Sequence, residues 1–245
     1  MDQGIWATWY DLDAGDRPRF LDWLHGEYAP ALQARPGFAW VAHYESVGGG
    51  ADMAKVRATV GHTDADVPGG TQFLLLVGAP STHTFYTPNA IQRERAETGR
   101  TGDMLAMRRG TRSCIFLEEA RVNGPAGHRR PLGTTPAPAI QMGSFRTRNF
   151  DDESDAGSWY AQDRLPRMAG MAECVGARKL ACVAGWPKHG ILYEWTSLQA
   201  RLDGFERTVE ADGLDATSWT ARLWRNIEHA PGSPTVARRI WPAAD

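Results

Sequence analysis

The chain has 245 residues, of which 42% are hydrophobic and 23% are charged, as is ordinary for a globular protein with a buried core. The net charge is −2, and acidic and basic residues are mixed along the chain without a basic stripe. The longest strongly apolar run, residues 73–77, is too short to span a bilayer. We therefore expect neither nucleic acid nor a membrane as a partner.

Two features indicate a cytoplasmic protein. The N-terminal residues Met1-Asp2-Gln3-Gly4 lack a basic segment followed by an apolar one, which disfavours secretion. The three cysteines, Cys114, Cys174 and Cys182, have no metal-type spacing and are typical of buried thiols in a reducing compartment.

Ten tryptophans are an unusual number for this length. A Trp-rich core explains them most simply, and a cavity around a flat apolar ligand is the alternative.

The first half shows a β-α-β-β-α-β order. Residues rich in β-formers predict strands at 5–10, 38–44, 72–77 and 113–118. Apolar residues at Leu21, Leu24, Tyr28 and Leu32 follow a helical period, and residues 89–100 form a second helix candidate.

The second half repeats this order after a segment rich in Pro and Gly at 121–138, which we interpret as a linker. Strands are predicted at 139–146, 176–183, 189–195 and 236–241, with helices at 151–168 and 197–210. The domains expected are therefore 1–120, which is the half expected to bear the site, and 139–245.

The spacing of two helix motifs supports a tandem duplication. Trp23-Leu24 followed by Pro30 matches Trp159-Tyr160 followed by Pro166, with the same internal spacing. Each unit covers one sheet face with helices and leaves the other bare, and a bare apolar face must be buried. We expect an α+β fold in which two ferredoxin-like units put their bare faces together in one barrel.

The segment Trp23-Leu24-His25-Gly26-Glu27-Tyr28-Ala29-Pro30, followed by Arg35-Pro36-Gly37-Phe38, resembles helix one of the dimeric α/β-barrel superfamily. The EthD-like branch is the most similar, since its helix carries a His, then a Pro, then a Pro-Gly. The resemblance implies a barrel with a ligand pocket. Relatives include cofactor-free oxygenases, isomerases, decarboxylases and cyclases acting on aromatic or polyketide-like molecules, and others that degrade or use haem.

Three residues are the candidates for catalysis. His25 lies on the apolar stripe of its helix, where a core histidine is the simpler reading and a general acid or base is the functional one. Tyr10, near the end of the first strand, could donate a hydrogen bond to a substrate oxygen. His43 and Tyr44 face opposite sides of their strand, and the sequence leaves open which of them faces the barrel.

The candidates for substrate binding are mostly aromatic. They are Trp6, Trp40, Tyr44, His83 and Tyr193. No metal site is expected, because the histidines are scattered and the cysteines unpaired. Dinucleotide, phosphate-binding and serine-hydrolase motifs are also absent from the sequence.

These observations favour a cofactor-independent acid–base enzyme, of the lyase or isomerase type, acting on a small aromatic or polyketide-like compound. The alternatives are a non-catalytic binding protein for a small aromatic ligand and a haem-using barrel oxidoreductase. We expect no cofactor in the first reading, and a homodimer is compatible with the sequence.

Overall fold

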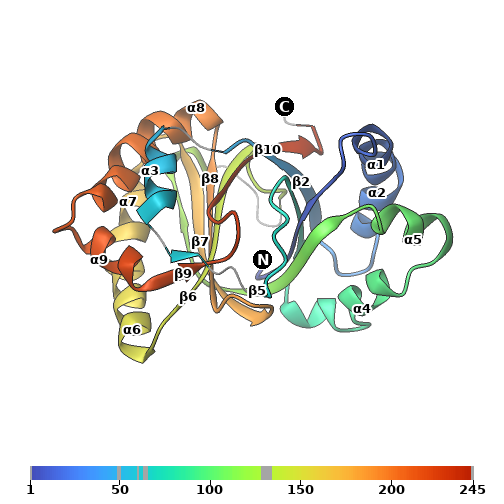
Figure 1. Ribbon diagram of the computed structural model, residues 1–245, viewed down its shortest axis with the longest axis horizontal. Helices are drawn as coiled ribbons and strands as arrows, with labels where there is room; N and C mark the ends of the chain where they lie inside the picture. The colour runs from blue at the N-terminus through green and yellow to red at the C-terminus, as the bar shows by residue number, and fades with distance from the viewer. Residues whose placement is uncertain (1, 49–50, 60, 63–65, 128–133, 244–245) are drawn as a thin grey trace.

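The computed structural model describes residues 2–48, 51–59, 61–62, 66–127 and 134–243. In these ranges eight long antiparallel strands close into a barrel, with the order β10-β2-β4-β1-β5-β7-β8-β6 and a further pairing of β10 with β6. Helices cover the barrel on two opposite sides, and the strands lie between them (Figure 1).

The strands of each half lie next to one another in the barrel. Those of the first half are β1 (Gly4–Asp11), β2 (Trp40–Ser46), β4 (Phe73–Ala79) and β5 (Arg109–Asn123). Those of the second half are β6 (Ala139–Thr147), β7 (Cys174–Ala184), β8 (His189–Trp195) and β10 (Thr235–Trp241). In both halves the four long strands pair in the order second, third, first, fourth. The mixed α+β barrel expected from the sequence is confirmed at this level.

The first helix layer contains α1 (Arg17–Trp23), the π-helical η1 (Leu24–Tyr28), α2 (Ala29–Gln33), the 3-10 helix η2 (Thr82–Phe85), α4 (Ala90–Arg95) and α5 (Gly99–Leu105). The predicted helix 89–100 is two helices, because Gly99 has a φ of +58° at the start of α5.

The second helix layer contains α6 (Phe150–Trp159), the π-helical η4 (Tyr160–Arg164), α7 (Leu165–Gly170), α8 (Leu198–Ala200), the π-helical η5 (Arg201–Glu210), the 3-10 helix η6 (Ala211–Leu214) and α9 (Trp219–Arg225). The short strands β3 (Gly61–His62) and β9 (Ile227–His229) extend the sheet beside β6.

Helix α3 (Ala51–Thr59) belongs to the first half in sequence but packs against the second helix layer (Figure 1). The Met53 amide donates to Glu206 Oε1 at 2.9 Å, and Arg57 donates to the Pro234 carbonyl at 2.8 Å. The sequence did not predict this helix, because it has no amphipathic pattern.

The predicted linker 121–138 is wrong at its start. Strand β5 continues to Asn123 and pairs with β7 through Arg121↔Arg178, Val122↔Ala177 and Asn123↔Gly176. The 3-10 helix η3 (Pro125–Gly127) follows, while residues 128–133 lie outside the described residues. The sequence did not show that the strand continues through 121–123, because Arg121 and Asn123 are polar and the segment runs into Gly124 and Pro125. Pairing with β7 holds these residues in the sheet and joins the two halves.

The barrel interior is a packed apolar core that draws on both halves. Its side chains are each at most 1% exposed, and they are Ile5, Ala7, Trp9, Trp40, Ala42, Tyr44, Leu74, Leu76, Cys114, Phe116, Ile140, Met142, Leu180, Leu192 and Ala237. Gly78 makes room for one of them, since a Cβ there would lie 2.0 Å from the Trp40 indole. The expected aromatic cavity between the bare sheet faces is therefore filled by side chains.

Within the described ranges, no helix combines the length and the apolar character needed to cross a membrane.

Candidate functional site

Strand alternation places the candidate residues on two different faces of the sheet. In β1, Trp6 and Tyr10 pack in the core beneath the first helix layer, whereas Trp9 points into the barrel. In β2, Tyr44 is the residue inside the barrel, where its hydroxyl donates to the Ala137 carbonyl at 2.9 Å. The adjacent His43 therefore faces the helix layer, which answers the question that the sequence left open.

The three catalytic candidates meet in one hydrogen-bonded chain beneath the first helix layer. The Tyr10 hydroxyl lies 2.7 Å from His43 Nε2. On the other side of the same ring, His43 Nδ1 lies 2.8 Å from His25 Nε2. Tyr10 and His43 are fully buried, whereas His25 is partly exposed. We call this array, Tyr10–His43–His25, the relay, because it links a buried phenol to the protein surface.

A local helix irregularity presents His25 to the relay. Residues Leu24–Tyr28 form a π-helical turn immediately before Pro30, which has no N–H to continue the α-helical ladder. The His25 ring stacks against Trp241 of β10, with centroids 6.4 Å apart. The second half has a π-helical turn at the matching place, before Pro166, but its residue in the His25 position is Ala161.

Burial keeps the relay neutral near pH 7. It lowers the pKa of His25, against the opposing effect of Asp22, and burial together with His25 and Arg108 lowers the pKa of His43 far below its ordinary value. Burial also raises the pKa of Tyr10. One proton arrangement satisfies the polar atoms of the chain: Tyr10 O–H donates to His43 Nε2, and His43 Nδ1–H donates to His25 Nε2.

An arginine lies directly over the phenol end of the relay. The guanidinium carbon of Arg108 is 4.7 Å from the centroid of the Tyr10 ring, and Arg108 Nη1 donates to Glu94 Oε1 at 3.1 Å. Tyr28 donates its hydroxyl to Glu94 Oε2 at 2.8 Å. Nothing in the sequence pointed to Arg108 or Glu94, since neither belongs to a motif and their pairing depends on how α4 meets the start of β5.

The predicted substrate-binding residues are not brought together. Trp6 lies under the first helix layer and Trp40 and Tyr44 inside the barrel, whereas His83 is exposed in η2. Tyr193 lies in the second half, where it lines a small cavity beneath the second helix layer. These five residues therefore do not form one pocket.

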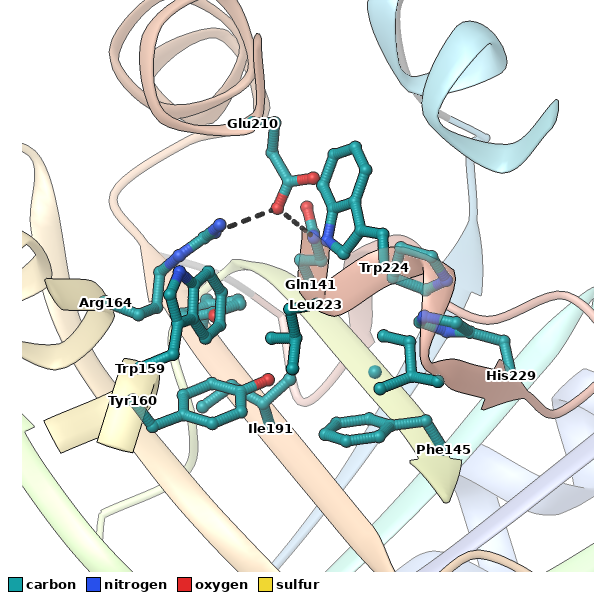
Figure 2. A pocket seen from close by; sticks show the side chains of 14 residues that line it. Gln141, Phe145, Trp159, Tyr160, Arg164, Ile191, Glu210, Leu223, Trp224 and His229 are labelled. Atoms are coloured by element: carbon teal, nitrogen blue, oxygen red, sulfur yellow. Dashed lines mark hydrogen bonds and ion pairs between the residues drawn. The ribbon is translucent and has the colours of Figure 1, made fainter. Parts of the chain in front are cut away.

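This second-half cavity is shown in Figure 2. Glu210 connects two of its polar residues, accepting hydrogen bonds from Arg164 Nη1 at 3.1 Å and Gln141 Nε2 at 3.3 Å. The guanidinium of Arg164 also lies over the Trp159 ring, at 4.3 Å from its centroid. The enclosed volume is about 40 Å³, which is room for a few waters.

The residues of this cavity do not fit a haem. Pockets for ligands of drug size are roughly 300–1,000 Å³, well above the 40 Å³ enclosed here. His229 lines the wall and could in principle serve as an axial ligand. However, the Phe145 ring centroid lies 5.8 Å from that of His229, and the ion pair of Arg164 and Glu210 occupies the other side of the cavity (Figure 2).

Metal binding has no support in the described part of the chain, where no group of three or more His, Cys, Asp or Glu side chains is placed to hold an ion.

No family model matches the chain, and no curated protein matches it significantly in sequence. Solved structures do share its fold. A candidate monooxygenase from Fusobacterium nucleatum has a TM-score of 0.58 and 6% identity, over 98% of this chain and 93% of that one. A candidate chlorite dismutase has a TM-score of 0.52 and 13% identity, over 98% and 96%.

A dye-decolorizing peroxidase from Bacteroides thetaiotaomicron is also similar, with a TM-score of 0.50 and 9% identity, over 98% of this chain and 93% of that one. Together with the closed antiparallel barrel, these likenesses show that the chain shares the fold of these solved structures. At such low identities they show the fold alone.

The comparisons overturn the first functional expectation. A cofactor-independent lyase or isomerase was expected, whereas the similar structures are described as a monooxygenase, a chlorite dismutase and a peroxidase, all of them oxidoreductases. They agree with the oxidoreductase alternative, although the second-half cavity does not accommodate the haem which that alternative named.

Proposed function

We propose that this chain is an oxidoreductase that oxidises a small hydroxyaromatic compound, with Tyr10–His43–His25 as its path for protons. The relay is the single observation that carries this proposal. It joins the fully buried phenol of Tyr10, through the buried imidazole of His43, to the partly exposed imidazole of His25. A packing role alone would not require an unbroken chain of hydrogen bonds that reaches the surface.

The chemistry of phenols gives the relay its role. A phenol that loses an electron must also lose its proton to become a neutral radical. Tyr10 would give the electron to a peroxide or to dioxygen, and its proton to His43 Nε2, while His43 Nδ1 passes a proton to His25. The substrate would lose an electron and its phenolic proton, and the electron, with a proton returning along the relay, would restore Tyr10. Two such cycles would supply the two electrons and two protons that reduce a hydrogen peroxide to two waters, or a dioxygen to hydrogen peroxide. Because the proton hops, no imidazolium needs to persist in the buried site.

The fold comparisons support the reaction class. The similar structures are described as a peroxidase and a monooxygenase among others, and such names imply oxidation by peroxide or by dioxygen. No step is assigned to a haem, since the described cavity of the second half does not fit one.

We also propose that the two halves are tandem ferredoxin-like units that arose by duplication. The equal pairing order of their strands and the π-helical turn before Pro30 and before Pro166 support this origin. Membership of the EthD-like branch and assembly as a homodimer remain predictions. Sedimentation of the purified protein would measure its oligomeric state.

A panel of hydroxyaromatic compounds tests the proposed function. We expect oxidation of some members, followed as oxygen uptake with air or as product formation with added hydrogen peroxide. Tight binding without turnover under both conditions would contradict an oxidoreductase and would favour a binding protein. A Soret band in the protein as purified, without added haemin, would contradict the poor fit of a haem.

Replacing Tyr10 by phenylalanine should abolish most of the oxidation. Tyr10→Phe removes the hydroxyl that begins the relay, and loss of a positioned proton-transfer group typically lowers turnover by about 10²–10⁴-fold. Tyr44→Phe is a matched control, because it also removes one buried hydroxyl from this half, but from the barrel interior. Both variants should lose about 1–3 kcal/mol of stability, whereas only Tyr10→Phe should lose turnover. Equal turnover in the two variants would show that the relay is structural.

A further inference from the structure

A second, larger cavity lies on the same side of the sheet as the relay. It is half open to solvent and has a volume of about 640 Å³ between α4, α5 and the start of β5, which is within the usual range for small-molecule sites. Its walls combine apolar and polar side chains, among them Ile91, Leu105, Thr111, Ser113, Glu94 and Arg108. The proposed function does not yet use this cavity.

Arg108 is the buried cation of the cavity wall. Its side chain is only 2% exposed, and its Nη1 is paired with Glu94. Its Nε and Nη2 are buried and have no hydrogen-bond partner among the described residues. These two nitrogens share the edge of the guanidinium that presents two parallel N–H groups, which is the geometry that a carboxylate accepts in a bidentate pair.

Leaving such donors buried without an acceptor is unfavourable. A carboxylate in the cavity would satisfy both at once. Besides Glu94, the carboxylates of Glu97 and Asp103 line the cavity, against the two cations Arg95 and Arg108, so a ligand with a single negative charge is favoured over a dianion.

We infer that this cavity binds the carboxylate of a small hydroxyaryl carboxylic acid through the Nε and Nη2 edge of Arg108. The inference deepens the proposed function, on which it rests for the statement that the ligand is also the substrate. The bound acid would lie close to the relay, since the guanidinium of Arg108 is 4.7 Å from the Tyr10 ring centroid. The apolar residues Ile91 and Leu105 would contact its ring.

Isothermal titration calorimetry with two matched ligands tests the inference on the intact protein. The first is 3-(4-hydroxyphenyl)propionate, and the second is 4-(3-hydroxypropyl)phenol, which has an alcohol in place of the carboxylate. Hydrogen bonds to a charged group contribute about 1.5–3 kcal/mol, so we expect the acid to bind about 10–100-fold more tightly than the alcohol. Arg108→Gln should remove that preference.

Arg112→Lys is the control variant. Arg112 is also buried with its Nε and Nη2 unpartnered among the described residues, but it does not line this cavity. The preference for the acid should therefore survive in Arg112→Lys. Arg108→Lys, which keeps the charge but loses the two-nitrogen edge, should lose most of the preference even if Arg108→Gln folds poorly.

Equal binding of acid and alcohol by the wild-type protein would overturn the inference, as would an unchanged preference in Arg108→Lys. The proposed function fails separately. If the acid binds through Arg108 but is not oxidised with peroxide or dioxygen, the carboxylate site stands and the oxidoreductase does not. If hydroxyaromatic compounds are oxidised without any preference for the acid, the oxidoreductase stands and the carboxylate site does not.

Discussion

Arg178→Met is expected to lower the free energy of unfolding by about 3–5 kcal/mol, because it removes the cation from a buried ionic cluster. Arg178 lies in β7 with its side chain 3% exposed, and it pairs with Asp2 Oδ2 at 2.8 Å and Glu194 Oε1 at 3.1 Å. Asp2 also accepts hydrogen bonds from Arg121 at 2.9 Å and from the Trp40 indole at 2.7 Å. The cluster thus ties the N-terminal strand and both halves of the barrel together.

The pH dependence of this loss has a definite sign. Burial raises the pKa of Asp2, but Arg178, Arg121 and the Trp40 hydrogen bond outweigh it and lower the pKa from 3.8 to about 2. A carboxyl with a depressed folded-state pKa contributes stability above its unfolded value, and this is lost as the pH falls through its folded value. The difference between wild type and Arg178→Met should therefore narrow between pH values of about 4 and about 2.

Urea denaturation at several pH values measures both effects. Arg238→Met is the control, since Arg238 is 59% exposed in its ion pair with Glu45 and should cost no more than about 1 kcal/mol. A loss for Arg178→Met as small as that of the control would show that the cluster does not hold the halves together.

Trp9→Ala is expected to cost about 3–5 kcal/mol, which is the usual loss for removing a large aromatic side chain from a packed core. Trp9 is fully buried in the barrel interior, where its indole donates to Thr235 Oγ1 at 3.1 Å and lies beneath the Arg112 guanidinium. The substitution would leave both a cavity and a hydroxyl without its donor.

This substitution separates a packed core from a ligand pocket. Trp186→Ala is the comparison, because Trp186 is only partly buried, with Arg146 over its ring. Thermal unfolding should show a large decrease in Tm for Trp9→Ala and a small one for Trp186→Ala. A Trp9→Ala protein as stable as wild type would mean that the barrel interior tolerates an empty pocket.

The sequence predicted the strands well because their residue preferences agree with their burial. The predicted strands 5–10, 189–195 and 236–241 differ from β1, β8 and β10 by one residue or less at each end. It failed where composition and tertiary pairing disagree. Residues 121–123 continue β5 because β7 pairs with them. Helix α3 lacks an apolar stripe, yet it contributes Met53 to the core beneath the second helix layer.

The site could be predicted only in part. Alternation along β1 and β2 showed which residues share a face, but it could not show which face lies inside the barrel. Tyr10 and His43 stand on strands separated by β4, so their contact depends on the register of Tyr10 with Phe73 and of His43 with Leu75. The role proposed for Arg108 could not be predicted from the sequence, because it depends on two neighbours brought together by the fold: the Tyr10 ring beneath the guanidinium and the cavity beside it.

Chemical rescue of His25→Ala tests the central claim most directly. His25 is the partly exposed end of the relay, so removing its imidazole should lower turnover of a hydroxyaromatic substrate by about 10²–10⁴-fold. Added imidazole should restore part of that loss in His25→Ala, but none in Tyr10→Phe, whose missing hydroxyl is buried. If folded His25→Ala keeps the turnover of wild type, or if imidazole leaves its reduced turnover unchanged, the Tyr10–His43–His25 chain is not a proton path.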